Sequence, residues 1–500
     1  MTNIQNIALL PITALVVALP ITAAELNTDL GVAAELTYTD NVCLSDDDTE
    51  DDWIASVTPN GSISSSGGGS RVNYNLSGSV RINSLANSDL RDKCGGGGFD
   101  NREQFLPQLN GNVNAELIQN WFFLDGAVRV SQNEVSPFVS GGDDPFDRTG
   151  NTNTTYDYTV SPYISRRFKD FALLNIRYVW NDQYNTADIV GDSEQERASA
   201  SLSSVPGTAR LSWGLQGNYS KTKFDDNDFV DPVNNQTELS SAQLNLGFQL
   251  TRSWQVNGFV GQEWNDFVSS RDDIDGTFWD VGVRWTPNSR IEVNAGIGER
   301  FFGNNPRFSM IYRHKRSAFT ASYAKTLTYS RDIRTEPEAP EVNPDFPPPP
   351  NIGQDVTTIT NNPILDERFT LGYSFQGRLT SFGISAFQSE QIQEEQSAVN
   401  TLRDAIYRGV VLSGSRSLSN LTSLNALIGW SEVEPKEDSG GGNVPLQDES
   451  ETWRGSLGLN HRLGLRTSIG VRYTYTDRQS ELGFNSYKEN RVTLTLRVSF

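Results

Sequence analysis

The stretch YKENRVTLTLRVSF, residues 487–500, decides the fold class of this chain. Val492, Leu494, Leu496, Val498 and Phe500 occupy alternate positions, and charged or hydroxyl residues stand between them. A strand with one apolar and one polar side lies between an apolar medium and a wet interior. The pattern is typical of the closing strand of an outer-membrane β-barrel. We predict that these five residues form the assembly-signal strand that contacts the barrel-assembly machinery.

The other end of the chain is typical of an exported protein. Residues 7–23 are mostly apolar, and Thr22, Ala23 and Ala24 form the small-residue pattern that precedes signal-peptidase cleavage. We therefore predict a signal peptide over residues 1–24 and a single barrel domain over residues 25–500. The first six residues contain no Lys or Arg, which leaves an uncleaved anchor helix as the alternative, although Pro11 and Pro20 disfavour it.

The two-sided alternation recurs along the chain. Leu244, Leu246 and Phe248, for example, stand against Gln243 and Asn245. Comparable segments occupy residues 72–82, 109–117, 211–219 and 469–475. Because one face is apolar and the other polar throughout, we expect antiparallel strands with lipid on one side and water on the other.

Connections between these segments alternate between short and long. Lys169-Asp170 and Lys315-Arg316 are short, whereas residues 133–154 and 330–366 are long and polar. Short periplasmic turns and long extracellular loops are typical of an up-and-down transmembrane barrel, and the count gives about 22 strands, within a range of roughly 18 to 24. The count is weakest at Pro59 and at the join of residues 303–306, which is short where a long one is expected.

Aromatic residues cluster near the ends of the expected strands and predict two girdles at headgroup depth. Those beside short turns are Trp121, Phe168, Phe171, Trp213, Trp254, Trp285, Phe319 and Phe382, and those towards long loops are Trp180, Tyr219, Trp264, Phe301, Tyr329 and Trp430.

Arginine recurs on the polar face. If the alternation holds, the lumen-lining candidates are Arg129, Arg177, Arg284, Arg300, Arg454, Arg472, Arg491 and Arg497, together with Arg71, Arg81, Arg210 and Arg462. Guanidinium groups along a wet path attract anionic solutes. They equally form internal salt bridges that stiffen the wall, with Asp125, Asp280 and Glu292 as counter-charges, and both interpretations stay open.

The chain contains two cysteines, Cys43 and Cys94, both in segments expected on the outer face. In an oxidising compartment they predict a disulfide between the first two external loops. Closing a loop of roughly 50 residues stabilises the fold by about 4 kcal/mol in chain-entropy terms. Two unpaired thiols are the alternative.

Catalysis finds little support in the sequence. The chain has only two histidines, His314 and His461, and no G-x-S-x-G, P-loop or HExxH motif. Acidic clusters such as residues 46–52 fit solvated loop tips, or divalent-cation bridges to lipopolysaccharide, and lack an EF-hand pattern. We predict no enzymatic activity, no cofactor and no dedicated metal site.

The net charge of the chain is −21, which disfavours nucleic acid as a partner.

Five segments, in this order, resemble a known family: LTYTDNVCL (residues 36–44), DWIASVTPNGSIS (52–64), NVNAELIQNWFFLDGAVRVSQNEVSPF (112–138), SPYISRRFKDFALLNIRYVW (161–180) and GTFWDVGVRWTPNSRIEVNAGIGERFFGN (276–304). They are similar to the outer-membrane β-barrel family associated with PEP-CTERM/exosortase systems. The resemblance implies a role in exopolysaccharide export or surface assembly, as a conduit or an anchor. It assigns no catalytic or binding residue.

We therefore expect a barrel of the bacterial outer membrane whose partners are membrane lipid, lipopolysaccharide, exopolysaccharide and export-system proteins. The alternatives are a general diffusion porin and a surface-anchoring or adhesion barrel. An energy-coupled transporter is disfavoured, because the first strand is expected near Leu30 and leaves no room for a plug domain. The proline-rich loop of residues 331–367 either folds inward as a constriction or extends outward as a recognition arm.

Overall fold

The computed structural model describes residues 25–66, 71–87, 105–139, 141, 151–187, 190–207, 209–225, 235–335, 363–394, 404–436 and 449–500. The predicted signal peptide, Cys94 and residues 336–362 of the proline-rich loop lie outside these ranges.

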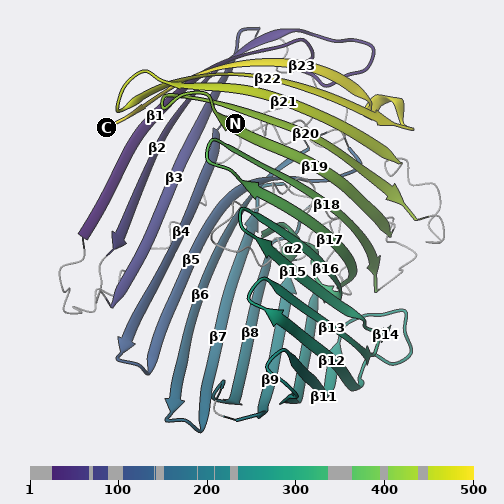
Figure 1. Cartoon of the computed structure of the whole chain (residues 1–500). Helices are drawn as coiled ribbons and strands as arrows, with labels where there is room; N and C mark the ends of the chain where they lie inside the picture. The colour runs from purple at the N-terminus through teal and green to yellow at the C-terminus, as the bar shows by residue number, and fades with distance from the viewer. Residues whose placement is uncertain are drawn as a thin grey trace.

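The described chain forms one antiparallel sheet that closes on itself (Figure 1). Each strand pairs with its neighbour in the sequence, and the first strand pairs with the last from Gly31 opposite Ser499 to Thr39 opposite Arg491. The backbone N–H of Phe500 adds a 2.8 Å hydrogen bond to the carbonyl of Leu30. This seam removes both sheet edges, which a barrel in lipid requires because no water is present to satisfy unpaired backbone groups.

The elements follow one another around the ring without a crossover. They are β1 (Glu25–Thr39), β2 (Asp52–Ser66), β3 (Val72–Leu85), β4 (Phe105–Ile118), β5 (Phe122–Glu134), β6 (Thr152–Phe168), β7 (Ala172–Asn185), β8 (Ser193–Ser204), β9 (Leu211–Phe224), β10 (Gln236–Gln249), β11 (Trp254–Asp266), β12 (Gly276–Asn288), β13 (Ile291–Arg300), β14 (Gly303–Asn304), β15 (Arg307–His314), β16 (Ser317–Thr328), α2 (Ser330–Thr335), β17 (Ile364–Gln376), β18 (Thr380–Gln393), β19 (Ala405–Ser417), β20 (Thr422–Pro435), β21 (Ser450–Arg462), β22 (Thr467–Ser480), the 3-10 helix η2 (Gly483–Asn485) and β23 (Tyr487–Ser499).

The prediction of an antiparallel up-and-down barrel of about 22 strands is confirmed. β13 pairs directly with β15, so the two-residue β14 is a small hairpin above the wall and the ring contains 22 strands. The short join noted in the sequence is this hairpin, at the rim where the other connections are long.

Pro59 lies inside β2 and faces Val32 of β1. The ladder between β2 and β3 skips Thr58 and Pro59, because proline has no N–H to donate.

The apolar face of the strands points outward. Leu244, Leu246, Phe248, Leu494 and Leu496 are all exposed on the outer surface. Such a surface is stable only against hydrocarbon, so the alternation places the membrane around the sheet. Among the described residues, no helix is long and apolar enough to cross a bilayer.

Three short turns contain a non-glycine residue in the left-handed backbone region. Asn120, Lys169 and Lys315 have φ angles of 55°, 49° and 50°. Tight hairpins with this handedness match the right-handed twist of the flanking strands. These turns form one rim, and both ends of the barrel sequence lie at that rim, as an even strand number requires.

Aromatic side chains mark both rims. Trp121 and Phe171 are exposed beside short turns, and Tyr219 and Trp264 are exposed towards the long loops. The placement of Tyr329 in the outer girdle is wrong. This residue is 3% exposed and lies inside the barrel, because the chain turns inward directly after β16.

Cys43 follows β1 and packs against a small cluster of Val42, Ile54, Leu85 and Leu106. Cys43 is disulfide-bonded. Because Cys94 lies outside the described residues, the pairing of these two cysteines stays a prediction.

The outward face generates a paired test at one point of the wall. Leu244→Arg places a charge in hydrocarbon near the middle of β10 and should lower the free energy of unfolding by about 2–4 kcal/mol. Gln243→Arg, one residue away, faces the lumen and should change it by less than about 1 kcal/mol. Urea titration in lipid vesicles measures both values, and an equal loss in the two variants would contradict the assignment of the faces.

Candidate functional site

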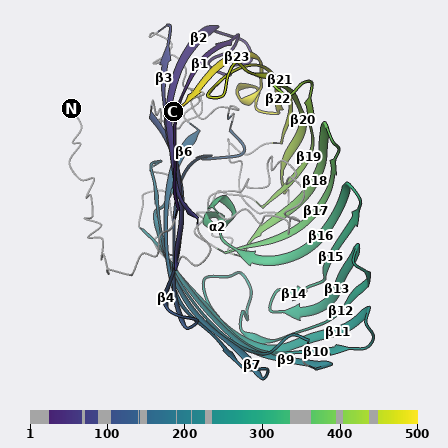
Figure 2. The same ribbon diagram turned by 60° about the vertical axis from the view of Figure 1, so that its left-hand side comes forward.

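The lumen is narrowed near the long-loop rim by a segment that leaves the wall after β16. We call residues 329–335, which include the short helix α2, the α2 segment. Figure 2 shows α2 inside the ring of strands rather than above it. Of the two alternatives for the proline-rich loop, its described beginning therefore follows the inward path.

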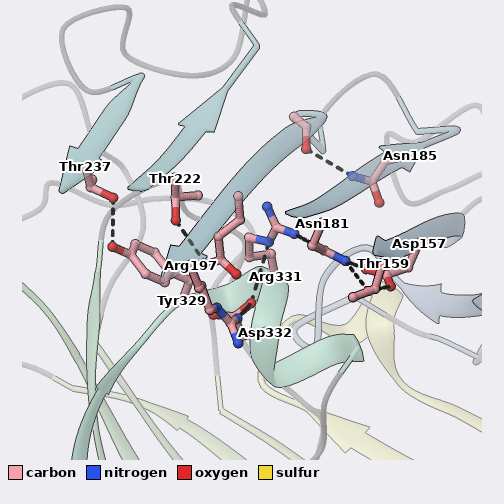
Figure 3. A network of polar contacts seen from close by, with 12 residues as sticks. Asp157, Thr159, Asn181, Asn185, Arg197, Thr222, Thr237, Tyr329, Arg331 and Asp332 are labelled. Atoms are coloured by element: carbon pink, nitrogen blue, oxygen red, sulfur yellow. Dashed lines mark hydrogen bonds and ion pairs between the residues drawn. The ribbon is translucent and has the colours of Figure 1, made fainter. Parts of the chain in front are cut away.

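Side-chain contacts hold the α2 segment against the wall formed by β7, β8 and β10 (Figure 3). The hydroxyl of Tyr329 lies 2.7 Å from Oγ1 of Thr237. Asp332 accepts a hydrogen bond of 3.1 Å from the guanidinium of Arg197, and Arg331 donates to Oδ1 of Asn181. Three strands thus fix the α2 segment, and two of the three contacts involve a charged guanidinium and belong to the stronger class of hydrogen bond.

Burial changes the titration of two groups in this segment. It raises the pKa of Tyr329 to about 12, so its hydroxyl stays protonated at neutral pH. It lowers the pKa of Arg334 to about 10, while the Tyr407 hydroxyl group opposes that shift. Arg334 therefore remains charged, and its proximity to Tyr407 places the end of α2 close to β19. The α2 segment extends from the β7–β10 wall towards the opposite side of the barrel.

A second segment crosses the lumen from the other direction. Residues 135–139, which we call the crossing segment, follow β5 and bury Phe138 against Phe387, Ala405 and Tyr407 of β18 and β19. Arg478 of β22 donates to the carbonyl of Pro137 at 3.1 Å. These strands are far from β5 in the ring, so the crossing segment bridges non-adjacent parts of the wall.

Asn151 shapes the crossing segment. Its Oδ1 accepts from the backbone N–H of Ser136 at 2.8 Å, and its Nδ2 donates to the carbonyls of Ser136 and Val139 at 2.8 and 3.2 Å. An asparagine that satisfies three backbone groups fixes the direction in which the loop leaves β5.

A third bridge joins two loops of the same rim. Arg271, between β11 and β12, donates from Nε and Nη2 to the two carboxylate oxygens of Glu394 at 2.8 and 3.2 Å. The backbone N–H of Ser270 donates to the Glu394 carbonyl at 2.8 Å. A bidentate pair with a buried carboxylate has a defined geometry, and it ties together loops that are six strands apart.

Several predicted lumen arginines form ion pairs along the wall. Arg177 contacts Asp125 at 2.9 Å and Ser161 at 2.7 Å, and Arg284 contacts Glu292 at 2.8 Å. Arg300 contacts Glu263, a partner that the sequence did not indicate. Arg129 stands opposite Asn110 and Asp157 in the ladder. The predicted counter-charge Asp280 is bound by Arg307, at 2.9 and 2.7 Å, and Arg307 is not one of the predicted lumen arginines.

Five of the other predicted arginines gather in one cavity, whereas Arg71, Arg210 and Arg462 do not line it. Arg454, Arg472, Arg491 and Arg497 line a space of about 650 Å³ against β17–β23, β1 and β3. Arg81, from the longer candidate set, also lines it and contacts Glu35 at 3.1 Å. Most of the lining lies in the half of the strands nearer the short turns, on the inner side of the two inward segments.

Sequence reasoning missed Arg331, Arg334, Arg408 and Arg478. Arg478 shares the parity of Arg472 on β22, so the alternation could have found it. Arg331 and Arg334 lie in a loop, where no period indicates direction. Neither histidine enters the lumen chemistry: His314 ends β15 beside a short turn, and His461 contacts the Thr422 hydroxyl at 2.9 Å near the same rim.

Loosening the α2 segment should be measurable as conductance. Tyr329→Phe removes the hydrogen bond to Thr237 and should cost the inward position about 1 kcal/mol, which raises the frequency of open events in planar bilayers roughly fivefold. Tyr373→Phe removes a similar hydroxyl contact, 3.1 Å to Ser317, at the short-turn rim and should leave the frequency unchanged. Identical traces from both variants would show that the α2 segment does not limit the path.

The loop between β7 and β8 should respond to pH. Burial raises the pKa of Asp192 from 3.8 to about 6; the 2.7 Å hydrogen bond from the backbone N–H of Asn185 opposes this shift, and Asp225 and Asp182 add to it. Because the pKa of Asp192 is higher in the folded loop than in the unfolded loop, the carboxylate binds a proton more tightly when the loop is folded. Its stability should rise as pH falls from about 7 through 6 and level off near 4. Hydrogen exchange at Asn185 and Thr186, corrected for intrinsic rate, should show this trend, and Asp192→Asn should abolish it. Protection that rises with pH would contradict the assignment.

Comparison with known proteins places the fold. No protein-family model matches the chain, and no curated protein matches it. The ferric enterobactin receptor of Pseudomonas aeruginosa, solved with enterobactin, is similar with a TM-score of 0.52 at 11% identity, over 95% of this chain and 82% of that one. The FrpB iron transporter of Neisseria meningitidis has a TM-score of 0.51 at 11% identity, over 95% and 83%. The siderophore receptor PirA of Acinetobacter baumannii has a TM-score of 0.50 at 9% identity, over 95% and 81%.

The expected role in exopolysaccharide export or surface assembly, as conduit or anchor, is wrong, and so are the alternatives of a general porin and an adhesion barrel. Solved structures with this architecture include siderophore receptors and an iron transporter, which points to ligand uptake. Exopolysaccharide and export-system proteins as partners lose their support, whereas contact with membrane lipid follows from the apolar exterior. The resemblance to the PEP-CTERM-associated family stays a prediction.

The closed sheet, the apolar outer band and the likeness to outer-membrane receptors lead to one conclusion. The chain is a β-barrel of the bacterial outer membrane.

Proposed function

We propose that this barrel is a ligand-uptake receptor whose outer mouth is narrowed by its own loops. The observation that carries the proposal is the α2 segment, which lies inside the lumen and is fixed to β7, β8 and β10 by side-chain contacts. These contacts hold the mouth in its narrowed state. A receptor needs a mouth that stays narrow until a ligand changes it.

The energetics suit a reversible constriction. The contact between Tyr329 and Thr237 joins neutral groups and is worth about 0.5–1.5 kcal/mol net, whereas the two contacts that involve a guanidinium are worth about 1.5–3 kcal/mol each, so together they favour the inward position by on the order of 5 kcal/mol. That preference corresponds to roughly a several-thousandfold excess of the narrowed state. A ligand must bind the open state more tightly by this factor to make the two states equally populated, and more tightly still to reverse the preference.

The crossing segment and the Arg271–Glu394 bridge act on the same rim. Both connect non-adjacent strands, so moving one loop affects the loops tied to it. Phe138 and Tyr329 are both nearly fully buried, so each inward segment is anchored in the lumen by an aromatic side chain.

The fold likeness supports the class of ligand. The similar structures are receptors named for siderophores and a transporter named for iron, which makes ferric siderophores the first ligands to test. Transport of this kind requires no catalytic group in the barrel. The described structure places loop segments of the barrel itself in the lumen, where an entering ligand would meet them.

The proposal is tested by uptake in the bacterium that carries this chain. Deleting the gene should lower the uptake of radiolabelled iron supplied as ferric enterobactin, or as a ferric hydroxamate siderophore, by at least fivefold, and the wild-type gene should restore it. The Gln243→Arg variant, whose change lies in the lumen wall away from the α2 segment, serves as the matched control and should restore uptake too. Unchanged uptake of both ligands, or a steady open conductance of the purified wild-type barrel, would refute the proposal.

A further inference from the structure

The cavity on the β20–β23 wall has an excess of positive charge. Its charged lining consists of five arginines and Glu35. Glu35 is engaged by Arg81 at 3.1 Å and also accepts from the Thr495 hydroxyl at 3.2 Å. Arg491 is buried against Glu489 at 2.8 Å. The charges of these two arginines are therefore balanced within the wall.

Arg472 and Arg497 differ from them. Both are exposed to the lumen, and among the described residues neither has a carboxylate within ion-pair distance. Exposed cations of the same sign on one wall repel each other and raise the local concentration of anions. Among the described residues, these two guanidinium groups therefore lack a direct ion-pair partner, and the cavity keeps a net positive charge.

The register of the sheet places a hydroxyl group directly opposite each arginine of this wall. Arg472 of β22 faces Thr493 of β23, and Arg497 of β23 faces Ser468 of β22. The same holds for Arg491 opposite Thr474, and for Arg454 opposite Thr476. A guanidinium beside a hydroxyl donor is a favourable arrangement for the oxygens of a carboxylate or phosphate.

Small residues leave the two exposed guanidinium groups accessible. On its other side Arg472 faces Gly458, and Arg497 faces Ala33. A Cβ at position 458 would lie 3.8 Å from Nε of Arg472, which is van der Waals contact. Even an alanine side chain there would therefore touch the guanidinium group. A larger residue there would cover the group instead of leaving it open to the lumen.

Spacing indicates the kind of anion. Arg497 lies four residues beyond Thr493, the partner of Arg472, so the two arginines are about 13 Å apart along the wall. The cavity of about 650 Å³ is within the size range of small-molecule sites. A compact ligand with several anionic groups can therefore contact one arginine–hydroxyl pair and remain within reach of the next.

Arg454 connects this cavity to the mouth. It lines the arginine-rich cavity and also a smaller space of about 110 Å³ beside the crossing segment, where Arg408 and Arg478 are its neighbours. Arg408 there contacts Glu432 and Glu434 at 2.6 and 2.8 Å. Guanidinium groups thus continue from the constricted mouth to the inner half of the barrel.

We propose that Arg472 and Arg497, with Thr493 and Ser468, form a binding site for a small multivalent oxyanion on the inner side of the constriction. The site holds an anion bearing carboxylate or phosphate groups after it has passed the mouth. This proposal adds to the proposed function that the ligand is an anion. It rests on the proposed function only for the statement that the anion enters through the mouth. Binding itself is a property of the barrel wall.

The test is isothermal titration calorimetry on the purified full-length barrel in detergent at low salt, with citrate and inorganic phosphate as separate probes. Wild-type protein should bind at least one of the two probes. Tighter binding of citrate would identify carboxylate groups as the preferred ligand, and tighter binding of phosphate would identify phosphate groups. The double variant Arg472→Gln/Arg497→Gln should weaken binding at least tenfold, or about 1.4 kcal/mol. Arg284→Gln, a lumen arginine already paired with Glu292, should change it less than twofold.

Two further measurements keep the outcome decisive. The double variant Arg472→Lys/Arg497→Lys keeps the charge but loses the planar fork, so it should lie between wild type and the glutamine variant. Heat-dependent gel mobility shows that each variant is a folded barrel. Absence of binding by the wild type, or equal losses in the Arg284→Gln and double glutamine variants, would overturn the site. Binding that depends on Arg472 and Arg497 in a protein that imports no ferric siderophore would overturn the proposed function and leave the site intact.

Discussion

The seam between β1 and β23 is the contact on which the rest of the structure depends. Hydrocarbon offers no hydrogen bonds, so every backbone N–H and C=O in the membrane must pair within the sheet. Nine consecutive residue pairs, from Gly31 with Ser499 to Thr39 with Arg491, join the two ends of the chain. Without this ladder both terminal strands would be open edges in lipid. Closure also creates an enclosed interior, and the inner surface becomes a place where polar chemistry is possible.

Closure combined with strict alternation determines how the charges are arranged. Every second residue of a strand faces the lumen, so arginines on neighbouring strands are brought to one surface at spacings set by the register. On the β4–β8 and β11–β15 walls acidic partners are close, as in Arg177 with Asp125 and Arg307 with Asp280. On the β20–β23 wall hydroxyl groups take the place of many of these partners. The same alternation therefore produces a braced wall in one region and a positively charged surface in another.

The mouth is organised by a different principle. The α2 segment and the crossing segment are held by contacts between residues that are far apart in the sequence, such as Tyr329 with Thr237 and Phe138 with Tyr407. Their inward path leaves buried groups such as Arg334, whose charge persists at neutral pH. These contacts narrow the mouth, and the proposed uptake function requires that the narrowing be reversible.

Sequence alone determined the wall of this protein. Period-two patterning in segments such as residues 487–500 and 243–250 is a local property, because the face on which a residue lies follows from its position in the strand. The number of strands, the fold class and the alternation of short and long connections could therefore be predicted. The expected cargo was wrong, since short resembling segments describe a barrel and not what passes through it. Only the tertiary structure decided the path of the loops. Tyr329 is typical of a girdle residue by its position, yet it lies in the lumen, because a loop has no repeating geometry and its direction is set by contacts with distant strands.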